Sequence, residues 1–305
     1  MISPPYLQPG DTIAIAATAR KITKDEIAPA VKLFQSWGLR VALPDHLFDA
    51  EDQFAGDDTT RTQALQCQLD DPDTKAIICA RGGYGTARII DALDFSRFLK
   101  APKWIVGYSD ATVLHSHLHN NLEVETIHAI MPINIPSDAH EIAYPATETL
   151  RKALFGIPLT YSCPPHPLNR PGRAEGPLVG GNLSILYSLC GSPSSIDTTG
   201  KILFIEDLDE YLYHIDRMMT NLKRNRMLDR LSGLIVGQMS DMHDNTVPFG
   251  KTAEEIIFDS VKEYGFPVCF GFPAGHIGTD NRALTLGRRA ALEVGTTTML
   301  RWQTP

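Results

Sequence analysis

The stretch Lys103–Asn120, KWIVGYSDATVLHSHLHN, joins a predicted buried strand to a predicted helix through one tight corner. Mostly apolar residues run up to Gly107, and apolar residues at helical spacing begin behind Ala111. Ser109 lies at the corner between them. A strand-to-helix turn with small flanking residues is typical of a nucleophile elbow, which presents a serine above a sheet. The alternative interpretation is an ordinary helix N-cap, since serine commonly occupies that position.

Short apolar runs alternate with helical patterns throughout the first half of the chain. This alternation predicts an α/β fold with a mostly parallel sheet and helices on both faces, and active groups beyond the carboxyl ends of the strands. Residues 159–176 are rich in proline and polar residues and lack periodicity, which indicates a linker or a crossing strand pair. We therefore expect an amino-terminal nucleophile domain (1–158), a linker (159–176) and a carboxy-terminal domain (177–305).

Bulk composition excludes several function classes. The net charge of −8, with no compensating basic cluster, argues against a nucleic-acid partner. No apolar stretch approaches the roughly 20 residues that a membrane span needs, and the first residues lack a signal-peptide pattern. The five cysteines are scattered and never spaced C-x-x-C, which argues against disulfides and structural zinc. We expect a cytoplasmic protein without a metal or other cofactor.

A second turn, Ala80–Arg88 with the sequence ARGGYGTAR, also follows a predicted strand and opens a helix. Its glycines allow backbone N–H groups to approach an anion. One use is an oxyanion hole, with a second donor from the N–H of Asp110. The alternatives are a phosphate cradle and a plain glycine-rich turn; the spacing matches neither dinucleotide nor P-loop motifs.

Acidic and histidine candidates lie in the second half. Glu206 ends an apolar strand, and further acidic residues follow it in a predicted loop. His276 lies in a loop rich in proline and glycine, where a general base is often found. Singly, these residues fit a solvated acidic loop and an exposed histidine. Together with Ser109 they form the chain order Ser, Glu, His of α/β-hydrolases.

The three histidines near Ser109 are a rival set. His115 and His119 are four residues apart and share a helix face, as in some zinc sites, but His117, and not a glutamate, lies between them. No third ligand follows at a diagnostic spacing. We expect these histidines to line a helix surface or a subunit contact, and not to serve Ser109.

Six segments in order resemble the LD-carboxypeptidase family of serine peptidases over nearly the whole chain. They are LQPGDTIAIAA, ARGGYGTARIIDALD, WIVGYSDATVL, GPLVGGNLSILYSLCGSP, LFIEDLDEYLYHIDRMM and FPAGHIGTDNRALTLG. The resemblance implies an amino-terminal domain like a class I glutamine amidotransferase (flavodoxin-like) and a smaller carboxy-terminal α/β domain. The chain departs from the family at 16–19, where Pro-Ser is frequent, and at 129–130, where Gly-Pro is frequent; both departures fall in substrate-side loops.

The resemblance also implies roles for individual residues. The family's triad falls on Ser109, Glu206 and His276, and its oxyanion donors fall on Asp110 and Gly83. The neighbouring Arg81 and Gly82 are candidate substrate contacts. Family members cleave the bond before the terminal D-alanine of cytoplasmic murein tetrapeptides during cell-wall recycling, need no metal and form homodimers.

Two further expectations concern the substrate. An enzyme that removes one carboxy-terminal residue needs a group for the free carboxylate, and arginine suits this by its bidentate fork. The candidates are Arg81, Arg217, Arg226 and Arg282. The alternative activity within the same family is that of microcin C immunity peptidases, which cleave aminoacyl or peptidyl nucleotide conjugates and need an aromatic platform for the base.

Overall fold

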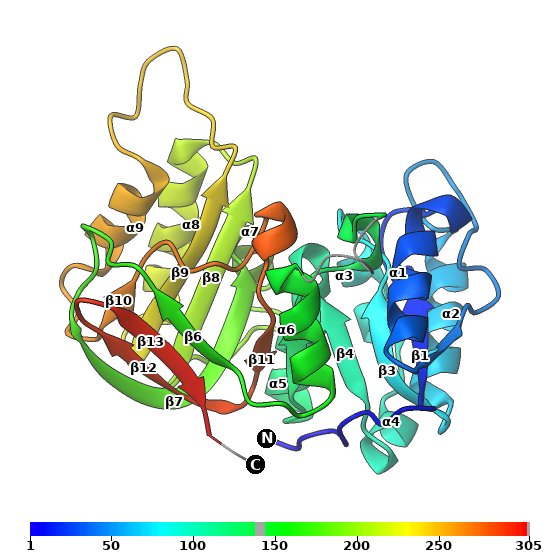
Figure 1. Ribbon diagram of the computed structural model, residues 1–305. Coiled ribbons are helices and arrows are strands. Elements are labelled where there is room, and N and C mark those ends of the chain that lie inside the picture. Colours follow the sequence, from blue (N-terminus) through cyan, green and yellow to red (C-terminus); the bar gives the residue numbers. More distant parts are fainter. Residues whose placement is uncertain (138–143, 304–305) are drawn as a thin grey trace.

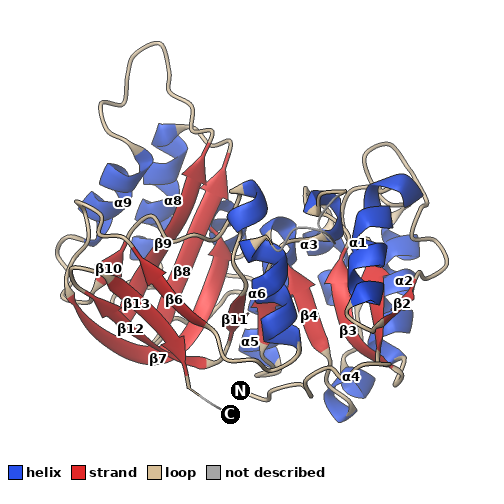
Figure 2. Ribbon diagram, in the orientation of Figure 1, coloured by secondary structure: helices blue, strands red, loops and turns tan. Residues whose placement is uncertain are grey.

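The computed structural model describes residues 1–137 and 144–303. Over these residues the chain forms one mostly parallel sheet and one mixed sheet, each with helices beside it (Figures 1 and 2). The predicted α/β class and the two-domain architecture are confirmed. The first sheet is built largely from the first half of the chain, and the second sheet from the second half.

The first sheet has the strand order β11-β5-β4-β3-β1-β2. The five strands from the first half are mutually parallel, and β11 pairs antiparallel with β5. The strands are β1 (Thr12–Ala16), β2 (Arg40–Ala42), β3 (Thr74–Cys79), β4 (Trp104–Gly107), β5 (Thr126–His128) and β11 (Leu284–Leu286).

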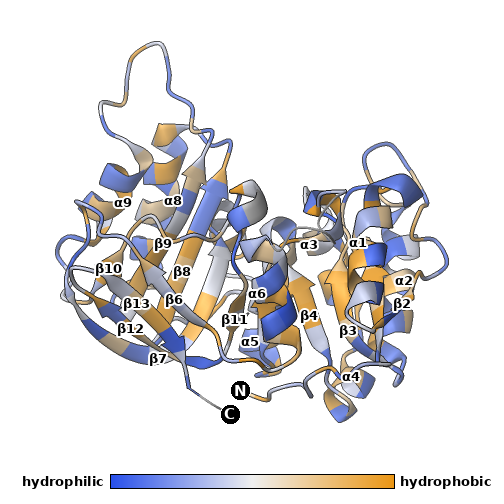
Figure 3. Ribbon diagram, viewed as in Figure 1, coloured by the Kyte–Doolittle hydropathy of each residue, from blue (hydrophilic) through white to orange (hydrophobic). Residues whose placement is uncertain are grey.

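The central strands β1, β3 and β4 are mostly apolar because both faces of the sheet are covered there (Figure 3). Alternate residues go to opposite faces, so Trp104 and Val106 join one core cluster and Ile105 joins another. Helices α1 (Lys24–Ser36) and α6 (Pro145–Leu154) contribute to the first cluster. On the opposite face lie α2 (Asp58–Asp70), α3 (Thr86–Ile89), α4 (Ser96–Lys100) and α5 (Thr112–Asn121).

The second sheet has the order β10-β9-β8-β7-β12-β13-β6. Strand β7 (Gly172–Asn182) connects the antiparallel and the parallel parts of this sheet. Its first part pairs antiparallel with β12, and its last part pairs parallel with β8. The other strands are β6 (Thr160–Cys163), β8 (Ile202–Leu208), β9 (Gly233–Ser240), β10 (Val268–Cys269), β12 (Arg289–Val294) and β13 (Thr298–Trp302). Its helices are α7 (Leu183–Ser188), α8 (Leu212–Arg224) and α9 (Ala253–Val261).

Short 3-10 helices complete the described secondary structure; they are η1 (Ile90–Ala92), η2 (Ser109–Ala111), η3 (Pro132–Asn134) and η4 (Gly278–Asp280). Helix α8 ends at Arg224, and two residues later Arg226 adopts a left-handed φ of 60°, which a continuing helix does not allow. Residues 159–176 contain β6 and the start of β7, so they are part of the second sheet. Residues 304–305 of the predicted carboxy-terminal domain lie outside the described part.

One strand crosses between the two halves. Strand β11 comes from the second half but pairs with β5 of the first sheet, through the register Leu284 to His128. The loop between β10 and β11, which contains His276, therefore runs from the second sheet to the first (Figure 1). A single core cluster includes Trp104 of the first sheet and Phe204 of the second, so the halves share one interior.

Candidate active site

Ser109 lies on a strained corner between β4 and α5. Its φ is 60°, a left-handed value that costs a non-glycine residue roughly 1–2 kcal/mol. The N-cap position of α5 is Ala111, with no side-chain capping bond, so the alternative interpretation of Ser109 as a cap is wrong. Within the described residues its hydroxyl has no hydrogen-bond partner. A partly exposed serine held in strain without a structural bond is the geometry of a nucleophile elbow.

The glycine turn after β3 lies directly against Ser109. A Cβ added to Gly82 would be 2.8 Å from Ser109 Oγ. Gly83 has a φ of 108°, which favours glycine. Strands β3 and β4 are adjacent and parallel, so their carboxyl ends bring the two turns together as the sequence predicted.

The Asp110 carboxylate ties the two turns to each other. It accepts a hydrogen bond of 2.9 Å from the backbone N–H of Thr86, at the start of α3. Asp110 is buried, and burial raises the pKa of its carboxyl although the Thr86 bonds oppose the shift. The sequence argument used only the backbone N–H of Asp110, and this side-chain role was missed.

Two backbone donors face no acceptor at this corner. Over residues 1–137 and 144–303, neither the N–H of Asp110 nor that of Gly83 makes a hydrogen bond. Gly83 is exposed, so its N–H costs nothing when unpaired. Two free donors beside a serine hydroxyl form the kind of pair that stabilises an oxyanion.

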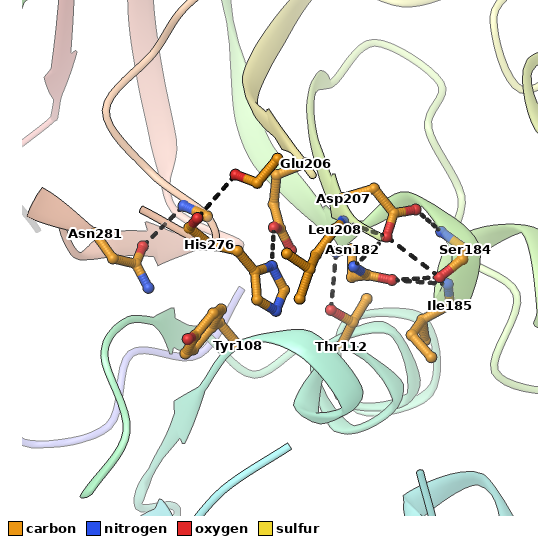
Figure 4. Close-up of polar contacts among 12 residues, drawn as sticks. Tyr108, Thr112, Asn182, Ser184, Ile185, Glu206, Asp207, Leu208, His276 and Asn281 are labelled. Atoms are coloured by element: carbon orange, nitrogen blue, oxygen red, sulfur yellow. Dashed lines mark hydrogen bonds and ion pairs between the residues drawn. The ribbon is translucent and has the colours of Figure 1, made fainter. Parts of the chain in front are cut away.

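Glu206 and His276 are joined directly. His276 Nδ1 lies 2.6 Å from Glu206 Oε2 (Figure 4). The second ring nitrogen, Nε2, has no partner in the described part of the chain and is left for a reacting group. Glu206 is fully buried on β8, and a Cβ added to Gly275 would meet its carboxylate at 2.8 Å. Ser240 Oγ donates to the His276 carbonyl, which fixes the backbone of the loop.

The pKa of His276 is raised by its acidic neighbours. Burial disfavours the imidazolium, but the hydrogen bond and charge of Glu206, together with the charge of Asp207, outweigh it. This arrangement strengthens His276 as a base. It also holds the ring with Nδ1 toward Glu206, as a carboxylate does for a catalytic imidazole.

The ring of His276 lies against the residue that precedes Ser109. Its centroid is 4.7 Å from that of Tyr108, and Figure 4 shows the imidazole between Tyr108 and the start of α5. No hydrogen bond joins Ser109 to His276 among the described residues. The structure therefore pairs Glu206 with His276 and Ser109 with the glycine turn, and Tyr108 adjoins both groups.

A buried polar network lies behind the pair. Asp207 accepts bonds from Asn182 Nδ2 and from the backbone N–H of Ser184, both at 2.8 Å. Burial, reinforced by the charge of Glu206, raises the pKa of Asp207 to about 7. The N–H of Asn182 donates in turn to Thr112 Oγ1 at 3.0 Å. The network therefore reaches from β8 to the helix that follows Ser109.

The histidines of α5 have structural partners, and the prediction of a surface position is wrong for two of them. His115 is buried and bonds the Gly107 carbonyl at 2.9 Å, and His119 is buried and bonds Thr126 at 3.0 Å. The reason is that α5 lies between the first sheet and β7. Half-buried His117 bonds Ser194 at 2.9 Å. Over the described residues, no cluster of three or more His, Cys, Asp or Glu side chains could hold a metal.

Three of the four arginines considered for the free carboxylate have acidic partners. They pair as Arg81 with Glu26, Arg226 with Asp229 and Arg282 with Asp280. Arg217 lies over the Tyr213 ring on the exposed side of α8. Arg226 follows the end of α8, which runs back from the carboxyl edge of β8, so it lies at the opposite edge from Glu206.

Comparison with known proteins places this geometry in context. Residues 13–129 match the family described as LD-carboxypeptidase N-terminal domain, and residues 175–292 match the LD-carboxypeptidase C-terminal domain. A probable murein peptide carboxypeptidase of Bacillus subtilis (strain 168) is 38% identical over 95% of this chain and 91% of its own. The microcin C7 self-immunity protein MccF of Escherichia coli is 26% identical over 88% and 86%.

A solved structure shares the whole architecture. The muramoyltetrapeptide carboxypeptidase from Oxalobacter formigenes superposes with a TM-score of 0.86 at 26% identity. The match covers 95% of this chain and 98% of that one. Within the described residues, no helix combines the length and apolar character needed to cross a membrane.

Proposed function

The chain belongs to the LD-carboxypeptidase family of peptidases, and we propose that it removes the terminal D-alanine from murein tetrapeptides by a serine mechanism. The observation that carries the proposal is the bond between buried Glu206 and His276, whose Nε2 has no partner among the described residues, beside a strained serine. The names of the Bacillus and Oxalobacter relatives support the murein substrate. Cytoplasmic cell-wall recycling and a homodimeric assembly belong to the same proposal.

In the proposed mechanism Ser109 Oγ attacks the carbonyl carbon of the bond before D-alanine, and its proton passes to His276 Nε2. Glu206 stabilises the imidazolium that results. The N–H groups of Gly83 and Asp110 hold the oxyanion. His276 then protonates the leaving amine as the carbon–nitrogen bond breaks, which leaves an acyl-enzyme on Ser109.

Hydrolysis completes the cycle through the same residues. Neutral His276 takes a proton from water, the hydroxide attacks the acyl carbon, and the proton returns to Ser109 as the ester breaks. No step needs a metal ion. The reaction requires the His276 ring and Ser109 to come within hydrogen-bond reach in the substrate complex, since such bonds are often long in the free enzyme.

The test is release of D-alanine from L-Ala-γ-D-Glu-meso-diaminopimelate-D-Ala, with a chelator present. We expect the wild type to release D-alanine and the Ser109→Ala variant to lose roughly 10⁴-fold or more in kcat. Release by that variant at the wild-type rate would show that Ser109 is not the nucleophile. Loss of wild-type activity in the chelator would contradict the metal-free mechanism.

A second candidate function is cleavage of aminoacyl or peptidyl nucleotide conjugates. The observation that favours it is an exposed aromatic group beyond β8, at the same edge as Glu206. Tyr211 and Tyr213 have ring centroids 5.6 Å apart, and His243 lies 5.6 Å from Tyr211. Rings of this kind can stack on a base. Cleavage of such a conjugate by a wild type that leaves the tetrapeptide intact would establish this function in place of the first.

A further inference from the structure

None of the four arginines considered from the sequence is placed by the structure as a clear carboxylate-binding group. Another arginine, Arg20, lies close to the candidate site. Arg20 follows β1, at the carboxyl edge of the first sheet. Along this edge β4, β3 and β1 are neighbours, and the residues that follow them are Ser109, the Gly82–Gly83 turn and Arg20. The glycine turn therefore separates Arg20 from Ser109.

Arg20 packs directly on the glycine turn. A Cβ added to Gly83 would meet Arg20 Cδ at 2.2 Å and Cγ at 2.6 Å, whereas one added to Gly82 would meet Ser109 Oγ at 2.8 Å. Consecutive Cα atoms are about 3.8 Å apart, so the two contacts are one peptide unit from each other. A peptide held by the Gly83 N–H lies next to the stem of Arg20.

The Arg20 guanidinium is available to a ligand. Its side chain is exposed, and over residues 1–137 and 144–303 it has no hydrogen bond or ion pair. The carboxylate of Glu26 is occupied by bonds from the backbone N–H and hydroxyl of Thr23 and by Arg81. Arg81 also donates to the Lys21 carbonyl at 3.1 Å, which turns it toward α1.

The direction of the reaction decides which part of the substrate Arg20 meets. His276 comes from the second half, and β11 beyond it joins the first sheet beside β5. Along the edge, Ser109 thus lies between His276 and the glycine turn. The leaving amine must face His276, because His276 protonates it. The acyl part extends toward the other side, over Gly83 and Arg20.

We propose that Arg20 binds a carboxylate on the acyl part of the murein peptide, the part that stays on Ser109. This inference rests on the proposed function. The acyl part offers two such groups: the side-chain carboxylate of meso-diaminopimelate and the α-carboxylate of D-glutamate. The planar fork of arginine matches either one with two parallel hydrogen bonds. Arg20 thereby determines specificity for acidic cell-wall peptides and takes no part in the bond chemistry.

The experiment compares wild type and Arg20→Ala on the tetrapeptide and on three analogues, each lacking one carboxylate. L-Lysine in place of diaminopimelate removes the side-chain carboxylate, D-isoglutamine removes that of D-glutamate, and a D-alanine amide removes the terminal one. On the tetrapeptide we expect Arg20→Ala to lower kcat/KM about 10- to 100-fold, mainly through KM. The loss should vanish on the lysine or the isoglutamine analogue, which identifies the partner.

Two controls accompany these measurements. Arg20→Lys keeps the charge but loses the fork, so it should recover part of the affinity. Lys21→Ala removes a neighbouring exposed cation and should leave kcat/KM unchanged, which separates a specific bond from a change in net charge. A penalty of equal size on all four substrates, or one that vanishes only on the D-alanine amide, overturns the proposal. A wild type inactive on the tetrapeptide contradicts the proposed function itself.

Discussion

At the edge of the first sheet the candidate site is built from backbone, whereas at the edge of the second it is built from buried side chains. Ser109 and Gly83 both adopt positive φ values, 60° and 108°, and the free donors are backbone N–H groups. Glu206 and Asp207, by contrast, are adjacent buried carboxyls within β8. Their neighbours along that edge are side-chain donors from His276 and Asn182.

The difference follows from how each edge is covered. Glu206 and Asp207 point to opposite faces of β8, and each face is packed, so each carboxyl needs its own donor. The first edge is open at Gly83, so the N–H of Gly83 remains unpaired there at little cost. Added atoms should therefore disturb the first edge, and changes of charge should disturb the second.

The largest loss of activity should follow Glu206→Gln, which removes a buried charge at the edge of the second sheet. Glutamine keeps the size but offers an N–H where His276 Nδ1 donates, so the ring loses its orienting acceptor. We expect kcat to fall roughly 10³- to 10⁴-fold, as measured by D-alanine release. A fall of less than about tenfold would mean that Glu206 does not orient the base. Asp209→Asn changes an exposed acid directly after β8; it is the matched control and should keep full activity.

The same substitution should move the pH profile. In the wild type the pKa of His276 is raised, so the acid limb of kcat/KM lies above the ordinary histidine value of about 6.5. Burial lowers the pKa of His276, and the Glu206 charge opposes this effect. Without that charge the pKa falls, so the acid limb of kcat/KM moves to lower pH. Protonated His276 also stabilises the folded wild type. This contribution to the free energy of unfolding is complete below pH about 6.5, the pKa of an ordinary histidine, and is lost as the pH rises through the higher pKa of folded His276. The free energy of unfolding of the wild type and of Glu206→Gln, measured across this pH range, checks the direction of the change.

The next effect tests the backbone edge, through Gly82→Ala. The added methyl group would lie 2.8 Å from Ser109 Oγ and 2.9 Å from Ser109 Cβ, so the nucleophile must shift. A displacement of about 1 Å costs roughly 10²-fold in rate. We expect kcat to fall by this factor while the far-ultraviolet circular dichroism is unchanged. Gly265→Ala, where no atom lies within 4 Å, is the control; equal losses in both variants would contradict the steric argument.

Many of the candidate site residues could be predicted from the sequence alone. Ser109, Gly83, Glu206 and His276 all follow or end predicted strands, so each of them could be assigned to the carboxyl end of its own strand, where active groups gather in parallel sheets. The apolar runs that mark these strands are local signals: the run that ends just before the glycine turn, for example, is part of β3. Their assigned roles remain predictions.

Contacts between distant segments could not be found in this way. Nothing in the pattern around Leu284 indicates that β11 leaves its own sheet to pair with β5. The burial of His115 depends on β7 packing over α5. The bond from the Thr86 N–H to the Asp110 carboxylate depends on where that side chain points, which the sequence pattern does not give. Glycines can mark such contacts, because a glycine is needed where two segments approach closely. At Gly181 an added Cβ would lie 2.5 Å from Thr112 Oγ1. That contact marks where the halves meet.

The smallest effect should come from the bond that joins the two edges, through Thr112→Val. Valine keeps the shape of threonine but leaves the buried N–H of Asn182 without its acceptor. An unpaired buried donor costs about 1–3 kcal/mol, so the free energy of unfolding should fall by that amount. Thr112→Ser keeps the hydroxyl and should recover most of it. Activity should fall less than in Gly82→Ala, because Asp110 still ties Ser109 to the glycine turn; a larger loss would mean that this bond, and not the elbow, sets the position of the nucleophile.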